Sequence, residues 1–145
     1  MQKKYFHKKG FSLIGTLAIA LSIFIFSSCS QKMTFGTSQV APAATGSVKI
    51  KKNNNDNYHV DVKTTHLAKP DQLTPPKNVY VVWMRTEDNA VRNIGKIKSS
   101  SGLLSKTLKG ELEATSTSKP TSFFITAEND GNIQYPGNEV ILQTK

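Results

Sequence analysis

The sequence predicts an all-β protein with a single antiparallel β-sandwich, preceded by an N-terminal apolar signal or anchor helix and a flexible tether. Three observations lead to this fold class. Apolar and polar residues alternate with a period near two, β-branched residues are frequent, and Asn, Asp, Gly and Pro clusters recur at short intervals. After the first thirty residues, no segment has the apolar spacing of a convincing amphipathic helix.

The first 29 residues have the pattern of an export signal. Four lysines precede an uncharged apolar run over residues 11–26, and the only cysteine, Cys29, follows two serines after that run. The run is shorter than the about 20 residues that a spanning helix needs. It resembles the signal of bacterial lipoproteins, in which the cysteine becomes the lipidated first residue. We therefore expect a signal peptide over residues 1–28 and acyl chains such as palmitate on Cys29; the alternative is an uncleaved signal anchor.

The position of the charges predicts where the protein resides. Lysines on the N-terminal side of an apolar run keep that end in the cytoplasm, so the chain after Cys29 is expected in the cell envelope, on the inner or outer membrane, facing the periplasm or the exterior. Without the signal peptide, fifteen basic residues face ten acidic ones, a net charge of +5. This charge is ordinary for a soluble domain. No motif indicates nucleic acid or a small-molecule substrate as a partner.

The composition divides the exported part into two segments. Residues 30–46 are mostly Ser, Thr, Gln, Ala, Gly and Pro, which predicts a flexible tether after the lipidated cysteine, so that residues 29–46 would form one linking segment. Residues 47–145 are then one domain with one core.

The domain begins with a predicted hairpin. Residues 47–52 alternate with Val48 and Ile50 on one face, and residues 58–63 alternate in the same way. Residues 53–57 are Asn-Asn-Asn-Asp-Asn, a turn composition. We expect this hairpin to have one buried face and one wet face.

The middle of the domain is predicted to contain its central strand. Residues 67–77 include three prolines and form a crossover loop. Residues 79–84 are apolar on both alternations, which is typical of a strand covered on both sides. We expect Trp83 to be the centre of the core as a packing residue, and not a ligand platform.

The remaining strands are predicted from shorter patterns. Residues 91–98 form a strand with Gly95 as a bulge, residues 99–105 a loop, and residues 106–113 a strand. The last two strands are residues 123–127 and 140–142. The total of about seven strands predicts an immunoglobulin-like sandwich without the cysteine pair of antibody domains.

Three short segments carry a family resemblance: residues 80–84, residues 93–97, and residues 124–128 with Gly131 and the Pro-Gly turn before residue 140. Over residues 47–143 the chain resembles the C-terminal extracytoplasmic domain of anti-sigma-K factors. The resemblance implies a sandwich fold and an envelope location. It does not imply sigma-factor inhibition, because only ten residues precede the apolar run and cannot form a sigma-binding domain.

The sequence shows no pattern of a catalytic or metal site. His59 and His66 are better explained as surface or packing residues than as metal ligands. The runs at 53–56 and 128–132 lack the acidic spacing and the distal Glu of a calcium loop. There is no Gly-x-Ser-x-Gly motif, and the thiol of Cys29 is reserved for lipidation. We expect no enzyme activity, no catalytic residues and no cofactor.

Three hypotheses for the function remain open. The first is a membrane-anchored lipoprotein whose sandwich binds an envelope protein or senses an envelope signal. The second is a module that binds an anionic glycan or a lipid surface through outward lysines. The third is a structural spacer. The lysines of the second hypothesis are Lys49, Lys51, Lys63, Lys96 and Lys98.

Overall fold

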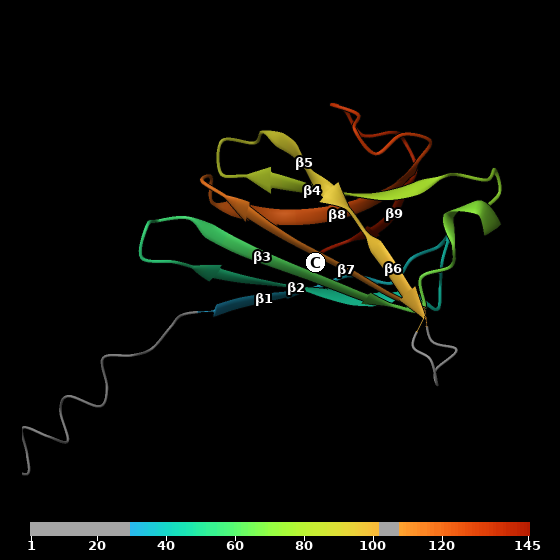
Figure 1. The fold of residues 1–145 in the computed structure, drawn as a ribbon, viewed down its shortest axis with the longest axis horizontal. Helices are drawn as coiled ribbons and strands as arrows, with labels where there is room; N and C mark the ends of the chain where they lie inside the picture. Colours follow the sequence, from blue (N-terminus) through green and yellow to red (C-terminus); the bar gives the residue numbers. More distant parts are fainter. Residues whose placement is uncertain (1–29, 102–107) are drawn as a thin grey trace, which may run out of the picture.

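A computed structural model describes residues 30–101 and 108–145 (Figure 1). The predicted signal peptide and Cys29 lie outside the described residues. The described part holds nine strands and one short 3-10 helix, η2 (Pro70–Gln72). The strands are β1 (Ser30–Thr34), β2 (Thr45–Lys52), β3 (Tyr58–Thr65), β4 (Val79–Thr86), β5 (Val91–Lys96), β6 (Lys98–Ser101), β7 (Leu108–Ser116), β8 (Pro120–Glu128) and β9 (Val140–Gln143).

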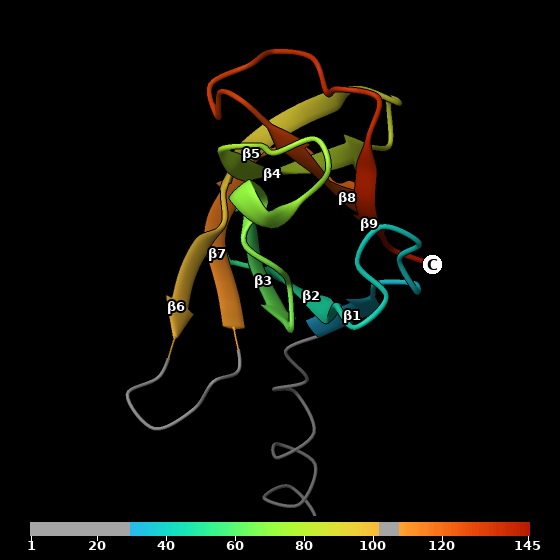
Figure 2. The same ribbon diagram turned by 90° about the vertical axis from the view of Figure 1, so that its right-hand side faces the viewer.

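The strands form two antiparallel sheets that stack face to face (Figures 1 and 2). One sheet has the order β1-β2-β3-β7-β6 and the other has the order β5-β4-β8-β9. The predicted β-sandwich is therefore confirmed. Apart from β1, these orders correspond to the A-B-E-D and C′-C-F-G sheets of immunoglobulin domains, so the strand order is immunoglobulin-like.

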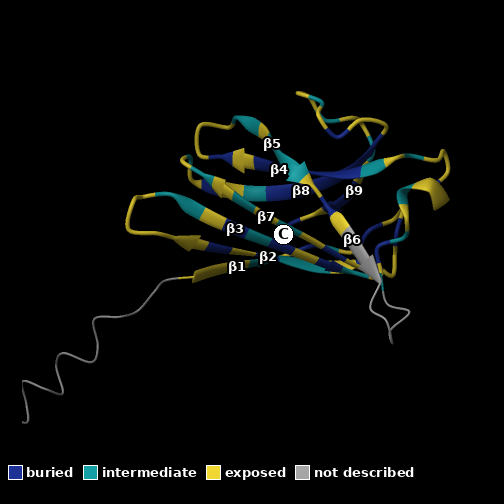
Figure 3. Ribbon diagram, in the orientation of Figure 1, coloured by how far each residue is buried: buried dark blue, intermediate teal, exposed yellow. Residues whose placement is uncertain are grey.

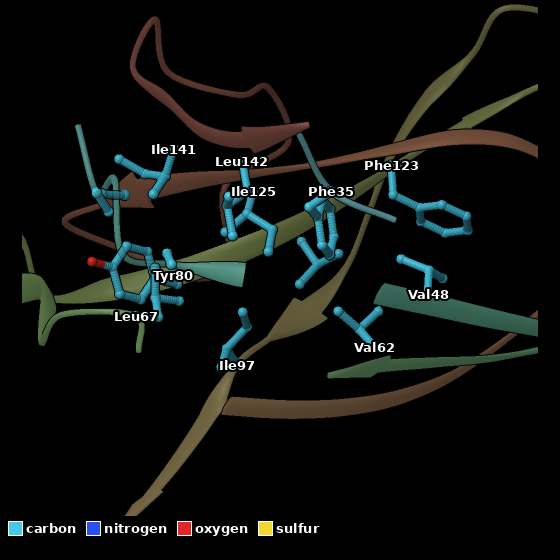
Figure 4. Packing of buried hydrophobic residues seen from close by; sticks show 14 of the residues in the cluster. Phe35, Val48, Val62, Leu67, Tyr80, Ile97, Phe123, Ile125, Ile141 and Leu142 are labelled. Carbon is cyan, nitrogen blue, oxygen red and sulfur yellow. The ribbon is translucent and has the colours of Figure 1, made fainter. Parts of the chain in front are cut away.

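The core lies between the two sheets and comes from alternate residues of each strand. Val48 and Val62 of the first sheet face Phe123 and Ile125 of the second (Figure 4), and Val60 is buried in the same cluster. Figure 3 shows buried and exposed residues interleaved along the strands. The predicted hairpin with one wet face is confirmed, because Lys49, Lys51 and Lys63 on the other alternation are exposed. Burial of this apolar set is the main stabilising contribution to the fold.

The Asn-rich turn between β2 and β3 forms as the sequence predicts. The side-chain Oδ1 of Asn53 accepts the backbone N–H groups of Asn55 at 2.9 Å and Asn57 at 3.0 Å. Asp56 has a φ of 60°, in the left-handed region that Asn and Asp tolerate. The turn residues therefore satisfy their own backbone and fix the register of the hairpin.

The predicted strand over residues 91–98 is two strands in two different sheets. At the predicted bulge, Val82 pairs with Gly95 and Trp83 with Asn93, so one extra residue sits in β5. The φ of Gly95 is +133°, which side-chain-bearing residues rarely adopt. The N–H of Ile97 then donates to the carbonyl of Tyr80 at 3.0 Å, and β6 continues in the other sheet beside β7.

The prediction of a flexible tether over residues 30–46 is wrong. β1 pairs with β2 along its whole length, with Ser30 opposite Lys51 and Met33 opposite Val48. Phe35 is buried and bridges to Thr144, so this segment joins the edges of both sheets. The physical reason is that the side chains of Met33 and Phe35 are on the inner face of the sheet and contact the core.

The place predicted for Trp83 is also wrong. Its side chain is fully buried, but it lies on the outer face of the four-stranded sheet, in a small cluster with Val81 and Phe124. Its ring stacks on Phe124 with a centroid separation of 6.2 Å, and its Nε1–H donates to Oγ1 of Thr126 at 2.8 Å. β4 is nevertheless a central strand covered on both sides, as predicted, because Ile133 packs against this outer cluster.

Candidate functional site

Four exposed lysines project from the outer face of β1, β2 and β3. They are Lys32, Lys49, Lys51 and Lys63, which we call the lysine face. The sequence predicts Lys49, Lys51 and Lys63 as outward lysines, and the structure places them on one surface. Lys32 is an addition that sequence reasoning missed, because it lies in the segment predicted as a tether.

The register of the strands brings these lysines together. Lys32 lies opposite Lys49, and Lys51 lies opposite Ser30. Like charges on directly opposed residues repel one another. Asp61 reduces this repulsion, because it lies opposite Lys49 and its Oδ2 is 3.6 Å from the Nζ of Lys63.

The carboxylate of Asp61 is only partly satisfied. Its Oδ1 is buried and has no hydrogen-bond partner among the described residues. A buried oxygen without a hydrogen-bond partner raises the free energy of the folded state unless a nearby positive charge compensates it. Four lysines around one carboxylate leave a net positive surface.

The outer face of this sheet becomes acidic at β7. Glu113 lies opposite Asp61, and Glu111 lies opposite Lys63 on one side and Lys98 on the other. Lys98 therefore faces a carboxylate, and it lies on β6, at the edge of the sheet opposite β1, so it does not belong to the lysine face. Lys96 lies on β5 of the other sheet, against Gly131. The five lysines predicted as one set thus divide between two sheets.

The second surface of interest is residues 129–139, which cross the outer face of the four-stranded sheet (Figure 2). The Nδ2 of Asn93 donates to the carbonyls of Gly131 at 3.0 Å and Ile133 at 2.9 Å. The Oε1 of Glu128 accepts the N–H of Gly137 at 2.8 Å. These contacts hold the segment at both ends, while the side chain of Tyr135 between them is 82 % exposed.

A shallow groove of about 650 Å³ borders this segment on the β5 side. Arg92, Asn93 and Lys96 line it from β5, and Asn132 and Gln134 line it from the crossing segment. The lining mixes polar and apolar side chains and is open to solvent, and its two charged side chains, Arg92 and Lys96, are exposed. An open groove of this kind offers a contact surface.

The two domain histidines lie apart from each other. His59 is exposed on β3 opposite Lys51, whereas His66 follows the end of β3 with a φ of 57°. Among the described residues, no group of three His, Cys, Asp or Glu side chains is placed to hold a metal ion.

Tyr80 is the most perturbed titratable group in the core. Burial raises the pKa of Tyr80 to about 12, and the negative charge of Glu139 contributes in the same direction. Its hydroxyl has no hydrogen-bond partner among the described residues, and Figure 4 shows it at the margin of the apolar cluster. The phenol thus stays neutral at physiological pH and acts as a packing residue.

No protein-family model, curated protein or solved structure matches this chain. In the described ranges, no helix is long and apolar enough to cross a membrane.

Proposed function

We propose that this chain is a lipid-anchored protein of the cell envelope whose β-sandwich binds a protein partner or senses an envelope signal, without catalysis. The position of Cys29 is the observation that carries the proposal. The cysteine follows an apolar run with a basic start and directly precedes Ser30, the first residue of β1. A single cysteine in an exported protein has no partner for an internal disulfide, and lipidation gives that thiol a role.

The physical effect of lipidation is strong retention on a bilayer. Each buried CH₂ group contributes about 0.8 kcal/mol, so two or three acyl chains on Cys29 hold the protein on the membrane almost permanently. The sandwich then acts at the membrane surface on the exported side.

Tyr135 is the best candidate for contact with a protein partner. Exposed aromatic side chains on a fixed backbone lose little conformational entropy on binding and are frequent hot spots of interfaces. The hydrogen bonds from Asn93 and to Glu128 hold the backbone around Tyr135. The resemblance to the outer domain of anti-sigma-K factors supports a role in partner binding or sensing.

The anchor is tested by replacing the thiol. We expect cells grown with a labelled fatty acid to mark the wild-type protein, and we expect Cys29→Ser to abolish the label completely because the serine hydroxyl does not replace the thiol in lipidation. In-gel detection of the label measures the effect. Conversion of the neighbouring Ser28→Ala, which keeps a small residue before the cysteine, is the control. Label that persists in Cys29→Ser would refute the lipid anchor.

The partner surface is tested by cross-linking in intact cells. We expect the wild-type protein to form a discrete adduct with an envelope protein, and Tyr135→Ser to reduce its yield at least ten-fold, because a hot-spot side chain contributes roughly 2 kcal/mol. Val40→Ser is the matched control, since Val40 is also exposed, at 42 %. Immunoblotting of the adduct measures both. An equal yield from both variants would exclude Tyr135 from the interface.

A second candidate function is binding of an anionic glycan, and the lysine face favours it. Such binding depends on charge and weakens with added salt. Retention on an anionic polysaccharide resin that falls steeply between low and high salt would support this candidate.

A further inference from the structure

We propose that the edge of the sandwich formed by β1 and β2, with Lys32, Lys49 and Lys51, lies on the anionic phospholipid headgroups of the bilayer that holds Cys29. This inference rests on the proposed lipid anchor and deepens it. It assigns an orientation to the domain and a lipid partner to the lysine face.

The first step in the argument is the distance between the anchor and the domain. Ser30 is covalently bonded to Cys29 and already lies in β1, paired opposite Lys51. One residue spans at most about 3.6 Å, so no spacer separates the lipid-bearing residue from the sheet. Lys32 follows two residues later, about 7 Å along the strand. The lysine face is therefore held next to the headgroups.

The second step is the state of the charges near the anchor. Among the described residues, Lys32, Lys49 and Lys51 form no salt bridge. The other lysines at this end of the sandwich are compensated, since Lys52 pairs with Asp56 at 2.7 Å and Lys119 pairs with Glu87. Lys32 and Lys51 face no carboxylate across the sheet, and Lys49 faces only Asp61, whose ion pair is with Lys63. The three lysines therefore remain available to lipid phosphates, which attract basic side chains close to the membrane surface.

The third step is the charge gradient across the sheet. Glu111 and Glu113 lie on β7, three strand positions from β1. Neighbouring strands are about 4.8 Å apart, so these carboxylates lie about 14 Å from β1, beyond the Debye length of about 8 Å at physiological salt. The orientation that places β1 on the bilayer therefore brings lysines to the headgroups and keeps the glutamates away from them.

This orientation leaves the proposed partner surface free. Residues 129–139 lie on the outer face of the other sheet, on the side of the sandwich away from β1, β2 and β3 (Figures 1 and 2). A domain resting on its β1–β2 edge thus exposes Tyr135 to a protein partner.

The test is lysine footprinting of the mature lipidated protein in vesicles. The protein is reconstituted in phosphatidylcholine vesicles with or without 30 % phosphatidylglycerol, labelled briefly with an amine-reactive ester and analysed by mass spectrometry. With phosphatidylglycerol, we expect the labelling rates of Lys32, Lys49 and Lys51 to fall at least five-fold. The exposed Lys69 and Lys98 serve as internal references and should change less than two-fold. In neutral vesicles, or in 0.5 M salt, the labelling rates of the three lysines should return to their unprotected values.

A matched pair of variants separates specific contact from net charge. In the wild-type protein we also expect partial protection of Lys63, which lies on β3 of the same outer face. The triple variant Lys32→Gln, Lys49→Gln and Lys51→Gln should lose this protection of Lys63. The triple variant Lys69→Gln, Lys98→Gln and Lys109→Gln has the same net charge and should keep that protection.

The outcomes distinguish this inference from the proposed function. The same mass spectra show whether Cys29 carries acyl chains. A lipidated Cys29 with equal labelling of all exposed lysines would overturn the orientation and leave the anchor intact. A Cys29 without lipid would overturn both. Protection by soluble dextran sulfate, but not by anionic vesicles, would also overturn the lipid contact and favour the glycan candidate.

Discussion

Trp83→Ala is expected to lower the free energy of unfolding by about 3–5 kcal/mol, the usual cost of removing a fully buried large aromatic side chain. The indole is 0 % exposed and stacks on Phe124, and its N–H donates to Thr126. The substitution leaves a cavity under residues 129–139 and an unsatisfied threonine hydroxyl. Urea unfolding followed by far-ultraviolet circular dichroism measures the change.

Two further variants show which contact is lost. Trp83→Phe keeps an aromatic ring but removes the donor to Thr126, so a smaller loss of about 1–3 kcal/mol is expected. Tyr135→Ala changes an exposed ring on the same surface and should alter stability by less than about 0.5 kcal/mol. Equal stabilities of Trp83→Ala and Tyr135→Ala would contradict the burial of the indole.

Phe35→Ala is expected to lower the free energy of unfolding by about 3 kcal/mol. Phe35 is 8 % exposed and packs in the core between the sheets (Figure 4). It also holds the segment that connects β1 to β2, because its N–H donates to the carbonyl of Gly46 at 3.0 Å. The same urea unfolding experiment measures the loss.

Val40→Ala is the control for Phe35→Ala. Val40 belongs to the same segment but is 42 % exposed, so the change should remain below about 0.5 kcal/mol. If Phe35→Ala proved as mild as Val40→Ala, residues 30–46 would behave as the flexible tether that their composition suggests.

The parts of the fold that alternation determines were predictable from the sequence. Val48 and Ile50 against Lys49 and Lys51 define a buried and a wet face without further information. The Asn53 turn was predictable because Asn and Asp satisfy local backbone groups with their own side chains. These features depend on interactions among residues that are close together in the sequence.

The features that depend on long-range packing were not predictable in the same way. Alternation shows that β4 has two apolar faces, but it does not show which of them meets the other sheet, so it does not place Trp83 on the outer face. β1 has only Met33 as an apolar inner residue, and Phe35 follows directly after the strand. The polar residues around them give no alternation from which the strand could be predicted.

The lysine face was predictable only in part. The sequence identifies lysines on outward alternations, but only the strand order separates Lys49, Lys51 and Lys63 from Lys96. Lys32 had no signal beyond a two-residue alternation with Met33. The sequence pattern also does not show that β7 neighbours β3. It therefore does not show that the carboxylates of β7 lie beside the lysines.

The pairing of β1 gives the N-terminal junction a mechanical property. Antiparallel hydrogen bonds run perpendicular to their strands, so tension applied along β1 from Ser30 loads its five registered pairs with β2 together, in shear. At the end of β1, the N–H of Lys145 donates to the carbonyl of Thr34 at 3.2 Å, and just after the strand the N–H of Gly36 donates to the carbonyl of Gln143 at 2.8 Å. A pulling force that enters at Ser30 is therefore shared between both sheets of the sandwich.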